Sequence, residues 1–188
     1  MSFLSEFQAE VLMRSQAIIS GWPATRFFEP NGRFFEFMDQ FKGKYICDCG
    51  SGSGFVPHAL RVWGHDAEGI DLYVREDGYP VTIKGATERE WRPTDFVLVC
   101  RPSHGGWAEE VIQNAVDAGA MVGYVGLYRN IHIDLSDELI TTVNRVVDHI
   151  GSEDEFMYCW GSGFNGTERP RMPLKDRCDR NMATVSWK

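Results

Sequence analysis

The sequence predicts an α/β fold with a mostly parallel sheet, helices on both faces and an antiparallel edge formed by C-terminal strands. Two observations carry this prediction. From Lys44 onward, short apolar runs of strand length alternate with longer segments of helical periodicity, which is typical of parallel sheets. Near the end of the chain, two more strand-like runs follow each other with no helical pattern between them, which favours antiparallel pairing.

Each predicted strand is a short apolar run bounded by glycine, proline or polar residues. The run DFVLVC is apolar throughout, as expected of a strand covered on both faces. The predicted strands are residues 45–49, 66–72, 81–86, 95–100, 120–127, 154–160 and 182–187.

Three helices are predicted between these strands, and their ends carry recognisable signals. Pro57 falls in the first turn of one helix, where a missing N–H costs little, and Gly64 ends it. Ser136 is a candidate N-cap for a segment whose apolar residues recur at helical spacing up to Gly151. The predicted helices are residues 55–64, 107–119 and 137–150.

The first 43 residues are predicted to form a helical and aromatic segment that packs on an α/β domain of residues 44–188. Leu4, Phe7 and Val11 fall near one face of an amphipathic helix. The aromatic-rich stretch that follows is expected to pack on the main domain, and the alternative is that its rings wall a ligand cleft.

Composition narrows the class of protein. The chain has 188 residues, a net charge of -8 and a sequence pI near 5.1, which disfavours nucleic acid as a partner. No run approaches the roughly 18 apolar residues of a membrane span, and no signal peptide pattern begins the chain. The five cysteines include no CxxC pair, so we expect reduced thiols and a cytoplasmic protein.

The run DCGSGSG (48–54) follows the first predicted strand, at the sheet edge where ligands bind in such folds. Its glycines permit unusual φ angles and let a ligand approach the backbone, so it predicts a ligand-binding loop, with a ligand-free tight turn as the alternative. A dinucleotide fingerprint would need glycine at position 55 or 57, which are Phe55 and Pro57. No GK[ST] ending of a P-loop follows either.

The spacing D-x-G-x-G-x-G resembles the first motif of the class I S-adenosylmethionine-dependent methyltransferases, which have a Rossmann-like fold. The resemblance implies S-adenosylmethionine as cofactor, with the glycine run beside its methionine part and Asp71 on the ribose hydroxyls. A carboxylate can accept two hydrogen bonds from a diol. The cofactor-binding residues that the resemblance implies are Asp48, Gly50, Ser51, Gly52, Gly54, Asp71, Leu72, Ala86, Thr87 and Cys100.

The chain departs from the family pattern in two places. After the third strand the family often has an acidic residue near adenine, whereas this chain has KGATERE, so Ala86 and Thr87 are placed there by position alone. After the fourth strand, CRPSHGG matches neither motif of the nucleic-acid methylating enzymes. In this fold that loop faces the methyl group, so the predicted catalytic residues are His104 as a base and Arg101 as a carboxylate ligand. The alternative is a loop histidine and a solvated arginine.

The function predicted from these residues is methyl transfer from S-adenosylmethionine to a small-molecule or protein acceptor. The main alternative is a non-catalytic module that keeps the nucleoside pocket or only the fold. A nicotinamide-dependent oxidoreductase is a weaker alternative because the fingerprint spacing fails. We predict no metal site, and we expect Cys47 and Cys49 to be buried free thiols rather than metal or redox groups.

Overall fold

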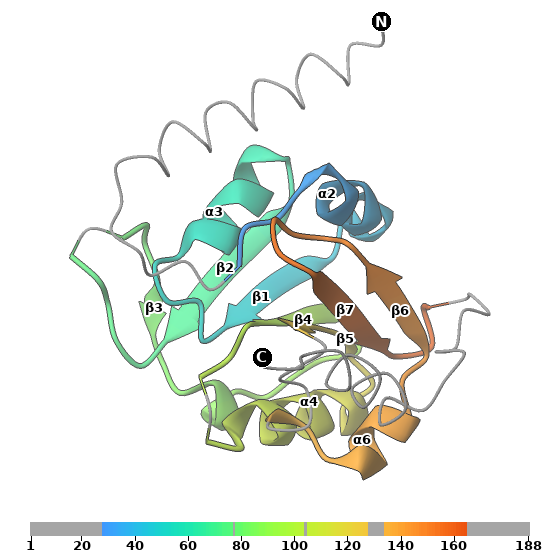
Figure 1. Cartoon of the computed structure of the whole chain (residues 1–188). Helices are drawn as coiled ribbons and strands as arrows, with labels where there is room; N and C mark the ends of the chain where they lie inside the picture. Colours follow the sequence, from blue (N-terminus) through green and yellow to red (C-terminus); the bar gives the residue numbers. More distant parts are fainter. Residues whose placement is uncertain (1–27, 77, 104, 128–133, 165–188) are drawn as a thin grey trace, which may run out of the picture.

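A computed structural model describes residues 28–76, 78–103, 105–127 and 134–164. They form one seven-stranded sheet in the order β3-β2-β1-β4-β5-β7-β6 (Figure 1). Strands β1 to β5 run parallel, and β7 is antiparallel to both of its neighbours, β5 and β6. The predicted fold class, a mostly parallel sheet with an antiparallel edge, is confirmed.

The strands are β1 (Tyr45–Cys49), β2 (Asp66–Asp71), β3 (Thr82–Ile83), β4 (Asp95–Cys100), β5 (Met121–Leu127), β6 (Arg145–Asp148) and β7 (Glu155–Trp160). The α-helices are α2 (Gly32–Met38), α3 (Phe55–Val62), α4 (Trp107–Asp117) and α6 (Asp137–Thr141), and two short 3-10 helices are η1 (Asp39–Phe41) and η2 (Ala86–Glu88).

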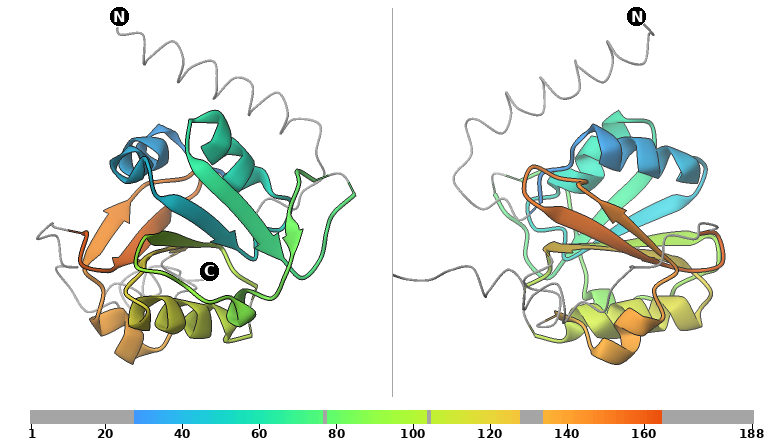
Figure 2. Two further views of the ribbon diagram at one scale, coloured as in Figure 1. Left: turned by 180° about the vertical axis from the view of Figure 1, so that it is seen from behind. Right: turned by 45° about the vertical axis from the view of Figure 1, so that its right-hand side comes forward.

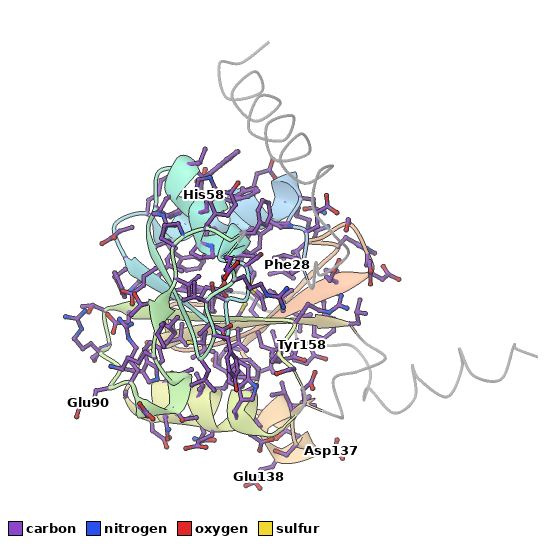
Figure 3. All side chains as sticks on the ribbon, turned by 90° about the vertical axis from the view of Figure 1, so that its left-hand side faces the viewer. Phe28, His58, Glu90, Asp137, Glu138 and Tyr158 are labelled. Carbon is purple, nitrogen blue, oxygen red and sulfur yellow. The ribbon has the colours of Figure 1, made fainter. Side chains whose placement is uncertain are left out.

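Helices cover both faces of the sheet. Figures 1 and 2 show α2 and α3 on one face and α4 and α6 on the other. Each face has its own apolar core, one built with α2 and α3 and the other with α4 and α6. In Figure 3, Phe28 lies on the first side of the sheet and Tyr158 on the second. The sheet is therefore buried on both faces, which explains the unbroken apolar runs of its central strands.

Asn31 joins the described part of the N-terminal segment to the far end of the sheet. Its side-chain oxygen accepts hydrogen bonds from the backbone N–H groups of Arg33 at 2.9 Å and Phe34 at 3.3 Å, which caps α2. Its amide donates to the carbonyl oxygens of His149 at 2.8 Å and Gly151 at 3.2 Å. Residues 1–27 lie outside the described residues, so the predicted boundary at residue 43 stays a prediction.

The glycines at the ends of α3 allow its abrupt start and stop. Gly54 is the N-cap, with φ +68°, and Gly64 follows the last turn with φ +98°. Both values lie in the left-handed region that favours glycine. The predicted helix of residues 55–64, with Pro57 in its first turn, is confirmed to within two residues of its end.

The predicted helix of residues 137–150 is wrong beyond its first turn. Ser136 does cap the helix, since its side chain accepts from the N–H of Leu139, but α6 ends at Thr141. Residues 145–148 form β6, which pairs with β7, so β7 has no free edge for the predicted strand 182–187. That segment itself lies outside the described residues. Five of the seven residues 141–147 are β-branched, which lowers the helix propensity of this segment, and pairing with β7 decides the structure.

Candidate functional site

The glycine loop, residues 50–54, follows β1 and turns back over the end of β2. The backbone N–H groups of Gly50 and Ser51 both donate to the carbonyl oxygen of Ile70, at 2.9 and 3.1 Å. All three glycines have positive φ: +68° at Gly50, +58° at Gly52 and +68° at Gly54. The unusual φ angles predicted for this loop are confirmed.

The three glycines are required for different reasons. A Cβ atom at Gly50 would lie 2.6 Å from the ring of Trp107, and one at Gly54 would lie 2.8 Å from the carbonyl oxygen of Tyr79. A Cβ atom at Gly52 would meet no atom within 4 Å. Gly50 and Gly54 therefore allow close packing, whereas Gly52 leaves its backbone open to an adjoining cavity.

Asp71 holds the glycine loop in place from the end of β2. Its Oδ2 atom accepts a hydrogen bond from the N–H of Gly52 at 2.8 Å, and its Oδ1 atom accepts from the N–H of Tyr73 at 3.1 Å. Each carboxylate oxygen has two lone pairs, so both atoms keep the capacity to accept from a ligand. Asp71 thus combines a position beside the loop with unused acceptor sites.

A cavity of about 460 Å³ opens where the loops after β1, β2 and β4 meet the turn η2. The predicted site residues that line it are Gly50, Gly52, Asp71, Leu72, Ala86, Thr87 and Arg101. Four others, Asp48, Ser51, Gly54 and Cys100, lie outside its lining, and His104 lies outside the described residues. The structure therefore brings most of the predicted ligand-binding positions together around one space.

Sequence reasoning missed Trp107 as a cavity residue. As the first residue of α4, it lies beside the loop. Its ring packs against Gly50, and its Nε1–H donates to the carbonyl oxygen of Ser103 at 3.1 Å. Its place directly after Gly105 and Gly106, at a helix start, was the available signal.

Arg101 lines the cavity in a strained conformation. Its φ is +48°, which is uncommon for a residue other than glycine, and its N–H donates to the carbonyl oxygen of Val125 at 2.8 Å. One guanidinium nitrogen lies 3.0 Å from Oε1 of Glu155 and 3.4 Å from Oε2 of Glu153. The alternative of a solvated arginine is wrong, because the side chain is only 18% exposed and paired with two carboxylates.

Glu155, the partner of Arg101, is 2% exposed at the start of β7. Burial raises the pKa of its carboxyl, while the N–H of Glu153 and the charge of Arg101 act in the opposite direction. The pair crosses from the loop after β4 to β7, and it was invisible in the sequence because 53 residues separate the partners.

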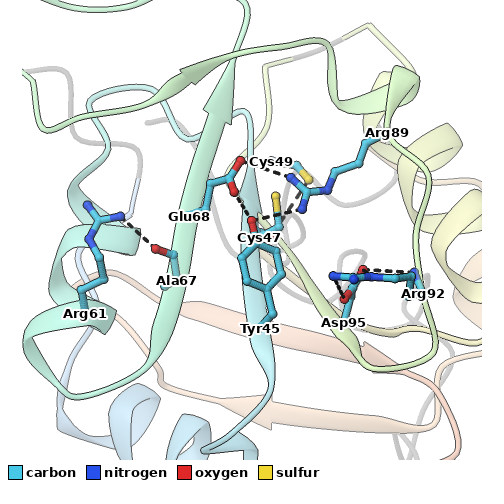
Figure 4. A network of polar contacts seen from close by, with 9 residues as sticks. All are labelled: Tyr45, Cys47, Cys49, Arg61, Ala67, Glu68, Arg89, Arg92 and Asp95. Atoms are coloured by element: carbon cyan, nitrogen blue, oxygen red, sulfur yellow. Dashed lines mark hydrogen bonds and ion pairs between the residues drawn. The ribbon is translucent and has the colours of Figure 1, made fainter.

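Arg89 anchors the turn η2, which carries Ala86 and Thr87 into the cavity wall. It contacts the hydroxyl of Tyr45 at 3.1 Å and a carboxylate oxygen of Glu68 at 3.2 Å (Figure 4). Tyr45 also donates a hydrogen bond to Glu68. The guanidinium lies about 5 Å from the ring centroids of Tyr45 and Trp91, a cation–π arrangement. These contacts tie the turn directly to β1 and β2.

Asp48 is a buried carboxyl in β1, two residues before Gly50. It is 1% exposed, and its Oδ1 atom has no hydrogen-bond partner within the part of the chain that the structure describes. Burial raises its pKa to about 8, a hydrogen bond from the Cys100 thiol lowers it, and the charge of Asp71 raises it. Asp48 is therefore mostly protonated at neutral pH.

The cysteines form no shared site in the described structure. Cys47 and Cys49 belong to the core on the α4 side of the sheet, and Cys100 belongs to the core on the α3 side. The four described cysteines are free and buried. Among the described residues, no three histidine, cysteine or acidic side chains gather as metal ligands. Within the same residues, no helix is long and apolar enough to cross a membrane.

Solved structures resemble this chain at low sequence identity. A protein of Pyrococcus horikoshii, provisionally named an RNA methyltransferase, superposes with a TM-score of 0.51 at 12% identity, over 84% of this chain and 98% of its own. A variant of the protein MtNAS in complex with S-adenosylmethionine gives 0.50 at 18% identity, over 82% of this chain and 71% of its own. No family model and no curated protein matches the chain.

This chain has the class I methyltransferase fold. A third structure, reported for the conversion of a disulfide bond into a thioacetal group during echinomycin biosynthesis, has a TM-score of 0.51 at 11% identity. It covers 93% of this chain and 97% of its own. Identities this low relate the folds and leave the activity of this chain to be argued from its own residues.

Proposed function

We propose that this chain binds S-adenosylmethionine in the cavity and transfers its methyl group to a small-molecule or protein acceptor. The observation that carries the proposal is the hydrogen bond between Asp71 and the N–H of Gly52, because it joins the two parts of a cofactor site at one point. An MtNAS variant of the same fold was solved with S-adenosylmethionine, which supports this choice of ligand.

The residues present fit such a cofactor. The open backbone at Gly52 leaves room for the methionine part, and the free acceptor sites of Asp71 suit the ribose diol. Leu72, Ala86 and Thr87 are the proposed neighbours of adenine, and the cavity they line has the size of a small-molecule site. When bound, the cofactor supplies an electrophilic methyl group for an in-line displacement.

The chain's own contribution to the transfer is chiefly orientation of the acceptor beside the methyl group. Arg101, Ser103 and Trp107 line the end of the cavity that follows β4. The ion pair of Arg101 with Glu155 helps to hold this wall. His104, two residues after Pro102 in the chain, is the proposed base for an acceptor that must lose a proton.

The second candidate function is binding of S-adenosylmethionine without methyl transfer. The state of Arg101 favours it, because a guanidinium already paired with two carboxylates is less able to bind an acidic acceptor. Both candidate functions include binding of S-adenosylmethionine, and they differ only in whether methyl transfer follows.

Thermal unfolding with added ligand tests the shared part of the proposal. S-adenosylmethionine or S-adenosylhomocysteine at about 100 times its dissociation constant should stabilise the protein by about 2.7 kcal/mol, and NAD should not. The matched variants are Asp71→Asn, which should lose most of the ligand effect, and Asp66→Asn at the exposed start of the same strand, which should keep it. Stabilisation by NAD alone, or equal ligand effects in both variants, contradicts the proposal.

A screen of small molecules and proteins for acceptor-dependent release of S-adenosylhomocysteine then separates the two candidates. Release above the acceptor-free rate supports methyl transfer. Binding of the cofactor without release for any acceptor class favours the binding module.

A further inference from the structure

Asp48 is a carboxyl buried beside the proposed cofactor site without the contacts that a buried charge needs. It is 1% exposed, and its Oδ1 atom has no hydrogen-bond partner in the described structure. Within the same residues, Asp48 forms no ion pair with any lysine, arginine or histidine. A carboxylate in this state is costly, so the group keeps its proton.

The groups around Asp48 do not relieve this cost. The thiol of Cys100, from the neighbouring strand β4, donates one hydrogen bond to the carboxyl. Asp71 faces it from the end of β2 with a further negative charge, and Cys49 follows it in β1. A single weak S–H donor against a nearby negative charge leaves the ionised form unstable, and burial accordingly raises the pKa of Asp48 to about 8.

A positive charge in the cavity would stabilise the ionised form of Asp48. Gly50, two residues after Asp48, lines the cavity, and so does Asp71, whose charge acts on Asp48. S-adenosylmethionine carries two positive charges, a sulfonium and an α-ammonium group, and only one carboxylate. An opposite charge within about 4 to 6 Å lowers the pKa of a carboxyl by roughly 1 to 3 units, which is a ten- to thousandfold change in its protonation constant.

We propose that Asp48 recognises the positive charge of the cofactor by giving up its proton when the cofactor binds. This inference rests on the proposed function. The O–H bond of the Asp48 carboxyl breaks, the proton passes to solvent, and the carboxylate that remains offsets the charge of the bound cofactor. Binding of the cationic cofactor is thereby coupled to release of a proton, and the association constant rises with pH.

Cofactor specificity follows from this coupling. A ligand without positive charge gains nothing from the ionisation of Asp48 and meets only a neutral carboxyl. The buried acid thus adds to the preference of the cavity for cationic ligands.

Isothermal titration calorimetry with S-adenosylmethionine near pH 7, in phosphate and in Tris buffer, tests the proposal, because the two buffers take up protons with different heats. The wild-type protein should release between half and one proton per cofactor bound. Asp48→Asn, which resembles the protonated carboxyl in shape and charge, should release less than half as much. Asp95→Asn is the matched control, since Asp95 is equally buried at the start of β4, and it should release as much as the wild type.

The pH dependence gives a second measurement. Between about pH 5.5 and pH 7, the wild-type association constant should rise up to about tenfold per pH unit, as expected when one proton is released. In Asp48→Asn it should stay nearly constant. Binding without proton release in the wild type, or equal release in Asp48→Asn, overturns the inference and leaves the proposed function standing. If the wild-type protein does not bind the cofactor, both the inference and the proposed function are wrong. If Asp48→Asn does not fold, proton release by the wild-type protein alone decides the question.

Discussion

Substitution of Asp48 by asparagine should change how the stability of the free protein depends on pH. The pKa of Asp48 is raised to about 8 in the folded protein by burial, against about 4 in the unfolded chain. The folded state therefore binds the proton more tightly than the unfolded state. The stability that this proton contributes is fully present below about pH 4 and is lost as the pH rises towards 8, because the unfolded state has already released its proton.

The size of the effect follows from the interval between the two pKa values. Between the two pKa values the folded state binds one proton more than the unfolded state. Each rise of one pH unit in this interval therefore lowers the free energy of unfolding by about 1.4 kcal/mol. Between pH 5 and pH 8 the loss from Asp48 is therefore about 4 kcal/mol, and above the folded-state pKa it levels off. Asparagine does not titrate, so Asp48→Asn should become more stable relative to the wild type by this amount across the interval.

Urea unfolding of both proteins at several pH values measures this difference, with the free energy of unfolding extrapolated to water. Comparison with the variant removes the contribution of other groups, including Glu155, whose pKa is also raised by burial and is the same in both proteins. Asp95→Asn serves as the control and should run parallel to the wild type. If the curves of the wild type and Asp48→Asn are parallel from pH 5 to pH 8, Asp48 is ionised in the folded protein and the reasoning is refuted.

Three further predictions concern the site. Gly50→Ala should lower the free energy of unfolding by about 3 kcal/mol or more, and Gly52→Ala by only about 1 kcal/mol, because both add a Cβ at positive φ but only the first meets a ring; urea unfolding measures both. Asp71→Asn should weaken S-adenosylmethionine binding about ten- to a hundredfold by calorimetry, and Asp66→Asn should not. His104→Ala should leave cofactor affinity unchanged and lower methyl transfer about a hundredfold once an acceptor is found; an unchanged rate would remove His104 from the chemistry.

The sequence predicted those parts of the fold that local patterns determine. The central strands are apolar along their whole length because both faces are covered, so their pattern is unmistakable. Residues 137–150 could not be assigned in this way. Leu139, Val143 and Ile150 fit a helical stripe, yet residues 145–148 satisfy their backbone by pairing with β7. Nothing within the segment indicates that partner, and tertiary pairing outweighs local periodicity.

The same distinction applies to the candidate site. The glycine loop and Asp71 were predicted because spacing along the chain fixes where they lie relative to the strands. The contacts that form the cavity wall after β4 could not be predicted in this way. The ion-pair partner of Arg101 comes from the start of β7, and the ring of Trp107 packs across to Gly50. Contacts between distant segments leave no periodic signal in a single sequence.

The conformation of Arg101 indicates which end of the cavity is specialised. A non-glycine residue at φ +48° carries a backbone cost on the order of 1 kcal/mol or more, which persists only where surrounding contacts hold it. Here the backbone bond to Val125 and the ion pair with buried Glu155 hold it, and an ordinary β4 terminus would need neither. Because Glu155 pairs with the guanidinium that lines the cavity, its carboxylate reduces the net positive charge that an acceptor meets there. An acceptor that is neutral at the reacting end therefore suits this wall better than an acidic one.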